Sequence, residues 1–233
     1  TVLHGVLEDV SRQLKEEKKS FSLLSDEERK KRVSESVVRI AAEYGNTILK
    51  DNSRNEYMIK RLTDLADRTV WAIGKQLERG EFAPDAYEMN FLVDEHEVLG
   101  DKSLYMQGKI DRIDICEDDN NVYVRVVDYK TGAPKTEFRD LDALFSADSR
   151  QRNAAALQTL LYSMMVSRTT GSDVQPALYY VRRMNDSDYS PLLVEGKREV
   201  FSFAPYRDPL QAHLQTTLAS LFDFSEPFRQ CDD

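Results

Sequence analysis

The stretch VRVVDYKTGAP, residues 124–134, determines how the rest of the sequence is interpreted. It begins with β-branched residues around Arg125, a composition that favours a strand buried in a core. The strand pattern ends in Asp128, Tyr129 and Lys130, and the glycine and proline that follow indicate a turn. An acid and a base separated by one residue therefore stand at the end of an otherwise apolar strand, and their role there has to be explained.

Alternating and helical patterns surround this strand. Residues 87–100 and 104–115 alternate as strands do, and DDNN at 118–121 supplies a turn before the strand at 122–129. Further on we expect a helix at 152–168, a strand at 176–183, a weaker strand at 198–203 and a helix at 208–224. This order predicts an α/β or α+β fold in which a mixed sheet is flanked by helices.

The N-terminal third has helical patterns only. Apolar residues recur at helical spacing over residues 1–19, and SDEE at 25–28 is a capping box that opens a second helix reaching about residue 45. A third helix is expected over 55–78, with Gly80 as its C-terminal stop. We expect an added helical region that packs on the core.

Composition excludes several classes of protein. The 233 residues suit one sizeable domain or two small ones, and 41% hydrophobic residues are enough to bury a core. The net charge of −9 gives no support to a wholesale basic coat for nucleic acid, although it leaves a local basic groove open.

The sequence lacks the signals of membrane and secreted proteins. No apolar run approaches the roughly 20 residues that cross a bilayer, and no signal peptide is visible. Cys116 and Cys231 form no CxxC pair, so a reducing, cytoplasmic location without a disulfide is expected. The sequence starts inside a helical pattern, and we expect it to be part of a longer protein.

Two acidic residues come together if residues 104–115 and 122–129 form a hairpin. Strict alternation would place Asp111 and Ile113 on one face, and Ile110, Arg112 and Asp114 on the other. Asp128 and Lys130 share a face by the same rule. Asp111 and Asp128 could then approach each other at one end of the sheet, beside the Lys130 ammonium.

Like charges that are buried side by side need compensation. Mg²⁺ provides it well, because this cation prefers carboxylate oxygens and keeps several waters, one of which becomes a nucleophile for a phosphodiester. Lys130 would assist proton removal and neutralise developing charge. The alternative is ordinary salt bridges, either Asp128 with Lys130 or Asp111 with Arg112.

Three segments together resemble a known family. GKIDRID at 108–114, VVDYKTG at 126–132 and QTLLY at 158–162 are similar to motifs of RecB-type nucleases in the PD-(D/E)XK superfamily, whose fold is restriction-endonuclease-like. The likeness is greatest to the C-terminal nuclease domain of AddB-type helicase–nuclease subunits. LHGVLED at 3–9 resembles the helix that carries a histidine in that family.

The resemblance implies a role for each matching residue. His4, Asp111, Asp128 and the backbone carbonyl of Tyr129 would be metal ligands, and Lys130 would be the catalytic lysine. Gln158 and Tyr162 lie four residues apart on one helix face and would position DNA and support the active site, with Asp111 and Asp128 counted in the catalytic set.

Each assignment has a structural alternative. His4 could be a histidine on a helix face without a ligand, and Glu8 on the same face could be a solvated charge. Gln158 and Tyr162 could be ordinary helix surface. Asp114 is expected in a structural ion pair with Arg112 or Arg125, because alternation separates it from Asp111.

Many AddB-type domains hold an iron–sulfur cluster on four cysteines, and two cysteines cannot form such a site. We therefore expect no cluster here. Basic residues near the motifs in sequence could line a DNA groove, or could be scattered surface charge: Lys135, Arg139, Arg150, Arg152, Arg182 and Arg183.

The resemblance implies a Mg²⁺- or Mn²⁺-dependent deoxyribonuclease, the exonuclease module of a DNA-repair and recombination helicase–nuclease, with DNA and a helicase domain or subunit as partners. Residues 1–233 would be one nuclease domain, divided into a motif helix at 1–19, a helical insertion at 20–80 and an α/β core at 81–233. One alternative is a catalytically inactive nuclease-fold module for DNA or partner binding. Another is a protein unrelated to nucleic acid that binds a protein partner through residues 20–80.

Overall fold

The computed structural model describes residues 2–43, 53–78, 83–97, 103–117, 122–133, 135–184, 186, 188–223, 225 and 227. Of these, residues 53, 76–78, 83–97, 103–107, 116–117, 122–123 and 149 are described by their backbone only.

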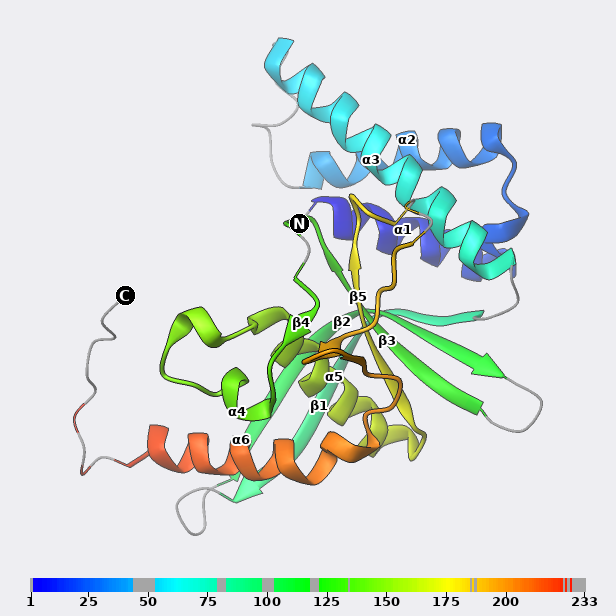
Figure 1. Ribbon diagram of the computed structural model, residues 1–233. Coiled ribbons are helices and arrows are strands. Elements are labelled where there is room, and N and C mark those ends of the chain that lie inside the picture. Colours follow the sequence, from blue (N-terminus) through cyan, green and yellow to red (C-terminus); the bar gives the residue numbers. More distant parts are fainter. Residues whose placement is uncertain are drawn as a thin grey trace.

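The main sheet has four strands in the order β1-β2-β3-β5 (Figure 1). The strands β1 (Ala83–Glu97), β2 (Ser103–Glu117) and β3 (Val122–Lys130) are antiparallel neighbours. The edge strand β5 (Val174–Tyr180) runs parallel to β3. The hairpin of β2 and β3 expected from the sequence is therefore present, and the sheet is mixed.

The connection from β3 to β5 carries the helix α5 (Ala154–Thr170), preceded by the short elements β4 (Glu137–Phe138), α4 (Leu141–Leu144) and η2 (Ser149–Gln151). Asn153 caps the start of α5, since its side chain accepts a hydrogen bond from the Ala156 N–H. Gly171 ends the helix in the left-handed conformation with φ of 70°. The Asn153 amide also donates to the carbonyls of Lys135 and Glu137, which fixes the segment after β3 against the start of α5.

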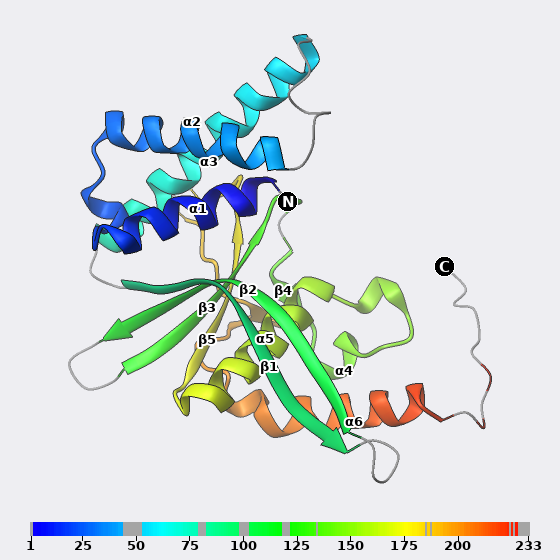
Figure 2. The same ribbon diagram turned by 180° about the vertical axis from the view of Figure 1, so that it is seen from behind.

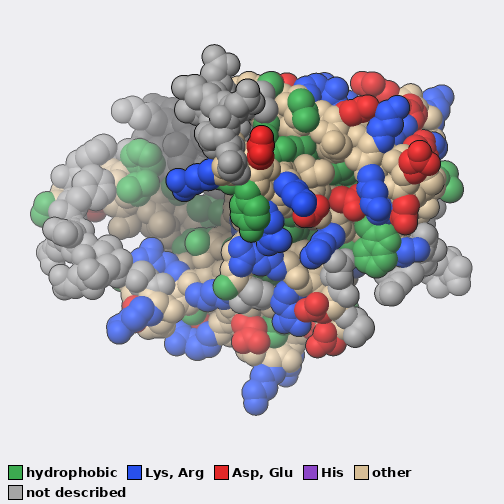
Figure 3. Space-filling view, turned by 90° about the horizontal axis from the view of Figure 1, so that it is seen from above, with side chains coloured by type: hydrophobic (Ala, Val, Ile, Leu, Met, Phe, Trp, Pro, Cys, Tyr) green, Lys and Arg blue, Asp and Glu red, His purple; other side chains and the backbone are tan. Residues whose placement is uncertain are grey.

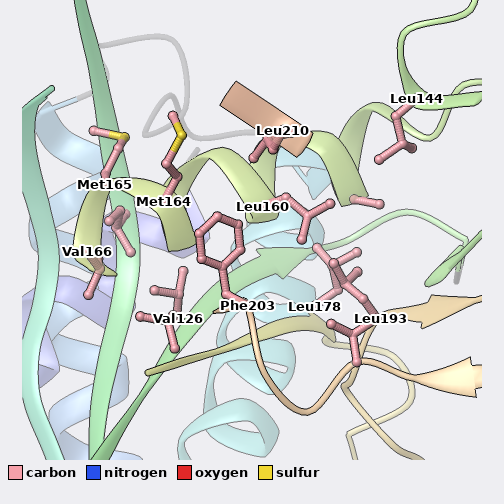
Figure 4. Packing of buried hydrophobic residues seen from close by; sticks show 14 of the residues in the cluster. Val126, Leu144, Leu160, Met164, Met165, Val166, Leu178, Leu193, Phe203 and Leu210 are labelled. Carbon is pink, nitrogen blue, oxygen red and sulfur yellow. The ribbon is translucent and has the colours of Figure 1, made fainter. Parts of the chain in front are cut away.

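One face of the main sheet is covered by α5, by the helix α6 (Arg207–Leu221) behind it, and by a small sheet. The small sheet has the order β4-β6-β7, with β6 at Val194–Glu195 and β7 at Arg198–Glu199, and the turn η3 (Ala204–Tyr206) leads into α6. Figure 4 shows Phe203 at the centre of this apolar cluster, between Met164 and Leu160 of α5 and Val126 of β3.

The other face is covered by the N-terminal helices, best seen in Figure 2. These are α1 (Val2–Glu16), the turn η1 (Phe21–Leu23), α2 (Asp26–Glu43) and α3 (Ser53–Glu78). Their apolar sides form a second cluster with Val127 and Tyr129 of β3 and Tyr179 of β5. The helix α1 is thus a layer of the core.

The outer surface of these helices carries charges of both signs (Figure 3). Ion pairs join them, such as Arg29 with Asp67 at 2.8 Å and Arg32 with Glu17 at 2.7 Å. Among the described residues, no helix is long and apolar enough to cross a membrane.

The mixed α/β class and the helical N-terminus are confirmed. Ser25 accepts a hydrogen bond from the Glu28 N–H at the start of α2, as the capping box predicted. The strand expected at 176–183 instead starts at Val174 and ends at Tyr180, with Pro176 inside it. A proline is tolerated there because β5 is an edge strand. The very short strands β4 and β6 had no detectable pattern in the sequence.

Candidate active site

The site begins where the ladder between β2 and β3 stops. The last paired residues are Arg112 and Val127, and one step further the Asp111 carboxylate takes over. Its Oδ2 accepts a hydrogen bond of 2.7 Å from the Tyr129 main-chain N–H. The Asp111 carboxylate thus replaces a backbone carbonyl of β2 as the acceptor for the Tyr129 N–H. This hydrogen bond fixes Asp111 beside the end of β3.

This geometry corrects one prediction. Strict alternation placed Ile110 and Ile113 on opposite faces, yet both belong to the cluster between the sheet and α5. The regular alternation of β2 fails around Asp111, where its pairing with β3 ends. Arg112 and Asp114 do share a face as predicted, and the Arg112 Nη2 donates to Asp114 Oδ2 at 2.8 Å.

His4 reaches the same point from α1. Its Nε2 lies 3.1 Å from Asp111 Oδ2 and 3.3 Å from the Tyr129 carbonyl oxygen. The hydrogen bond with Asp111 raises the pKa of His4, against the opposing effect of burial. The imidazole therefore binds a proton more tightly than a free histidine does, and it lies between two of the predicted metal ligands.

Asp128 lies close by in a more buried position. Burial is the main cause that raises the pKa of its carboxyl to about 6, and the charge of Asp111 acts in the same direction. Lys130 opposes the shift, with its Nζ 2.6 Å from Asp128 Oδ2. The ammonium thus meets this buried oxygen as a close ion pair.

A chain of hydrogen bonds holds Lys130 from α5. Its Nζ donates to Gln158 Oε1 at 2.8 Å, and Gln158 Nε2 donates to the Tyr162 hydroxyl at 2.9 Å. The Tyr162 ring lies against Gly108 of β2, where a Cβ would come 2.5 Å from ring atom Cε1. Gln158 and Tyr162 are therefore a bridge between Lys130 and β2.

The six side chains expected at the site, with the Tyr129 carbonyl, thus converge. Glu8 does not join them: its side chain is 44% exposed and faces Lys109 Nζ at 3.4 Å. The salt bridge of Asp128 with Lys130 is present, whereas Arg112 pairs with Asp114 instead of with Asp111.

The donor set fits a hard divalent cation, although in the described part of the chain no group of three His, Cys, Asp or Glu side chains is arranged to hold a metal. Carboxylate and carbonyl oxygens are the ligands that Mg²⁺ prefers. Asp111 and Asp128 each have a basic side chain against them, His4 and Lys130. The two carboxylates therefore already hold positive groups at the place where a cation would bind.

Two features escaped the sequence interpretation. A glycine inside a strand indicates a close approach of another group, and this signal could have pointed from Gly108 to Tyr162. No pattern could have indicated that Arg112 would lie buried beneath Tyr129, because arginine is rarely buried.

The basic residues suggested for a DNA groove are mostly held by their own neighbours. Arg139, Arg150 and Arg183 pair with Asp140, Asp148 and Asp186, and Lys135 donates to the Arg152 carbonyl. The side chain of Cys116 and all of Cys231 lie outside the described residues, so the expectation about an iron–sulfur cluster stays a prediction.

Comparison with known proteins agrees with the geometry. The family model described as PD-(D/E)XK nuclease superfamily matches residues 1–232. AddB-type subunits of ATP-dependent helicase/deoxyribonucleases are similar to parts of the chain. The one from Exiguobacterium sibiricum is 32% identical over 151 residues, which are 60% of this chain and 13% of that protein. The one from Lachnoclostridium phytofermentans is 35% identical over 142 residues, 60% of this chain and 12% of that protein.

A longer match is to the corresponding protein of Thermoanaerobacter sp., 27% identical over 201 residues, 79% of this chain and 16% of that protein. The matched regions thus span between 12% and 16% of the length of these three relatives. The family match covers nearly the whole chain and includes every residue of the site. The chain belongs to the PD-(D/E)XK nuclease superfamily and is related to the AddB-type subunits of ATP-dependent helicase/deoxyribonucleases.

Proposed function

We propose that this chain is a metal-dependent deoxyribonuclease and forms the exonuclease module of a larger helicase–nuclease. The observation that carries the proposal is the meeting of Asp111, Asp128 and Lys130 where the pairing of β2 with β3 stops, in a member of this superfamily. The names of the relatives, which join a helicase to a deoxyribonuclease, support DNA as the substrate and a helicase domain or subunit as the partner.

The residues that would hold Mg²⁺ or Mn²⁺ are Asp111, Asp128, His4 and the carbonyl of Tyr129. When bound, the cation supplies positive charge at the phosphodiester and a more acidic water. Lys130 would neutralise the charge that develops on the phosphate and assist proton removal from the attacking water. Gln158 holds the Lys130 ammonium in place through its Oε1, and the Tyr162 hydroxyl holds the Gln158 amide.

We also propose that residues 1–233 act as one nuclease domain, with 20–80 as a helical insertion on an α/β core at 81–233. The packing of α1 supports this arrangement. Its apolar side shares a cluster with Val127 and Tyr129 of β3, while His4 from the same helix contacts Asp111. The helices α2 and α3 then pack on α1.

The direct test is cleavage of linear duplex DNA in the presence of Mg²⁺. We expect Lys130→Ala and Asp128→Ala each to lower the rate by at least about a hundredfold, the loss typical of removing a catalytic group. Lys197→Ala is the matched control, because Lys197 is an exposed lysine in the turn between β6 and β7. The proposal fails if both site variants cut DNA as fast as the control.

A catalytically inactive module for DNA or partner binding is the alternative, and the ion pair of Asp128 with Lys130 is compatible with it. Calorimetric titration with Mn²⁺ separates the two functions. A nuclease should bind Mn²⁺ with an affinity that falls in Asp111→Asn and Asp128→Asn, whereas an inactive module should show no binding that depends on these carboxylates.

A further inference from the structure

A buried ion pair lies beneath the site, on the sheet face that α1–α3 cover. Arg112 is 2% exposed and Asp114 is fully buried, and the Arg112 Nη2 donates to Asp114 Oδ2 at 2.8 Å. The same guanidinium donates through Nη1 to the Tyr129 hydroxyl at 2.7 Å. Its central carbon lies 5.6 Å from the centre of the Tyr129 ring and 5.2 Å from that of Tyr179.

Stability alone is a poor explanation for this pair. Removing two charges from water costs free energy that their attraction seldom exceeds, and apolar residues of similar size often serve a core as well or better. Among the described residues, Arg112 Nε and Asp114 Oδ1 also lack hydrogen-bond partners, so the pair is incompletely satisfied. The planar guanidinium of Arg112 does fix an orientation, because its N–H groups point in set directions and so determine where the Tyr129 hydroxyl lies.

The position of the ion pair along β2 explains why the orientation of Tyr129 has to be fixed by a side chain. Arg112 belongs to the last paired step between β2 and β3, so regular ladder bonds do not hold Tyr129 against β2. Two consecutive residues of β2 hold it instead. Asp111 accepts from the Tyr129 main-chain N–H, and Arg112 donates to the hydroxyl at the far end of the side chain.

Tyr129 therefore links the buried pair to the site. Its ring lies in the core between the sheet and α1, while its carbonyl oxygen faces His4 Nε2 at 3.3 Å. A turn of the backbone at Tyr129 would carry the packed ring with it and break its contact with Arg112, so this contact resists such a turn. The N–H at Asp111 and the carbonyl at His4 would then move together.

We propose that Arg112, charge-balanced by Asp114, is a positioning residue that holds Tyr129 so that its main-chain N–H and carbonyl stay aimed at Asp111 and His4. This inference deepens the proposed function and rests on it, since the carbonyl is among the groups proposed to hold the cation.

Two variants test the positioning role without leaving a buried charge unpaired. Tyr129→Phe removes only the hydroxyl, and Arg112→Met combined with Asp114→Leu removes both charges and keeps the volume apolar. The first readout needs neither metal nor substrate: amide hydrogen exchange at Tyr129, compared with Val126 in the same strand. We expect exchange at Tyr129 to become about tenfold faster in both variants, as for loss of one local restraint, while Val126 is unchanged.

The second readout is the Kd for Mn²⁺ by calorimetry, which we expect to rise about tenfold in both variants, the loss typical when a residue that orients a ligand is removed. The combination of Tyr129→Phe with the double variant should add no further loss, because all three changes break one link. Unchanged exchange at Tyr129, or faster exchange along the whole of β3, would overturn the positioning role. A parent protein that does not bind Mn²⁺ would instead count against the proposed function, and the exchange data would still decide the role of Arg112.

Discussion

Tyr162 occupies the space that a side chain at Gly108 would need, since a Cβ at position 108 would come 2.5 Å from the ring. Gly108→Ala should therefore displace the ring from β2 and weaken its contact with Gln158. We expect a loss of stability of about 1 to 3 kcal/mol, typical of overpacking, and a fall in nuclease rate of about tenfold or more. Urea unfolding and DNA cleavage measure the two effects.

Gly132→Ala is the matched control for stability, because a Cβ there would meet nothing within 4 Å. If the effect of Gly108→Ala on activity passes through Tyr162, it should largely disappear in a Tyr162→Ala background. Full additivity of the two changes would contradict this explanation.

The hydrogen bond from Lys130 to Gln158 should be needed for a fast reaction. Gln158→Met keeps the length of the side chain and removes the 2.8 Å contact with the ammonium. We expect kcat to fall by about tenfold, since a misplaced catalytic group loses much of its effect. Tyr162→Phe, which removes only the hydroxyl that supports Gln158, should cause a smaller loss in the same parameter. Equal kcat in all three proteins would mean that Gln158 does not orient Lys130.

Asp128 should make the metal-free protein less stable as the pH rises from about 4 to about 6. Burial raises the pKa of its carboxyl from 3.8 to about 6, so over this range the folded protein keeps a proton that the unfolded chain has lost. Ionisation then costs the folded state free energy at every higher pH. We expect Asp128→Asn to remove this fall and to be about 1 to 3 kcal/mol more stable at pH 7.5. The measurement is urea unfolding with EDTA between pH 4 and 8.

Asp188→Asn is the control for that experiment, because the Asp188 side chain is 80% exposed. The free energy of unfolding of Asp188→Asn should change with pH as that of the parent does between pH 4 and 8. A destabilised Asp128→Asn at pH 7.5 would show that the carboxylate is satisfied in the folded protein and that its burial carries no penalty.

His4 should contribute a second dependence on pH, at higher values. Its hydrogen bond with Asp111 raises the pKa of the imidazole above 6.5, so the folded protein binds the proton more tightly than the unfolded chain. The resulting stability is fully present below pH 6.5 and is lost as the pH rises through the pKa of the folded state. In metal-free buffer, the free energy of unfolding of the parent should decline over that range more than that of His4→Gln.

His213→Gln provides the comparison for His4. His213 pairs with Asp142, whose side chain is 81% exposed, and exposed ion pairs contribute little. The free energy of unfolding of His213→Gln should fall with rising pH by as much as that of the parent. If the free energy of unfolding of His4→Gln falls with pH as much as that of the parent, then the contact with Asp111 does not make His4 bind its proton more tightly in solution.

Much of the fold follows from local patterns in the sequence. Residues 1–19 and 152–168 were expected as helices and contain α1 (Val2–Glu16) and most of α5 (Ala154–Thr170). The strand expected at 122–129 is β3, because an apolar β-branched run between turns has few other stable conformations. Elements of two residues, such as β4 and β6, escape such an analysis because their existence depends on partners distant in the sequence.

The residues proposed for the site also came from the sequence, since the resemblance to nuclease motifs implied His4, Asp111, Asp128, Lys130, Gln158 and Tyr162 without coordinates. Their mutual positions were decided by tertiary structure. Alternation alone predicted the wrong face for Ile110, because it assumes a regular strand and β2 stops pairing with β3 beside Asp111. The contact of His4 with Asp111 depends on α1 packing on the sheet, across 107 positions of sequence.

The burial of Arg112 shows the same division most clearly. Its neighbours are given by the sequence, GKIDRID, but an arginine next to an aspartate is most often at a surface. Only the helical layer over the sheet excludes water from the guanidinium, and only the end of the β2–β3 ladder brings Tyr129 within its reach. Residue types and short-range spacing thus specify which chemical groups are present, whereas desolvation and pairing between distant segments specify what those groups can do.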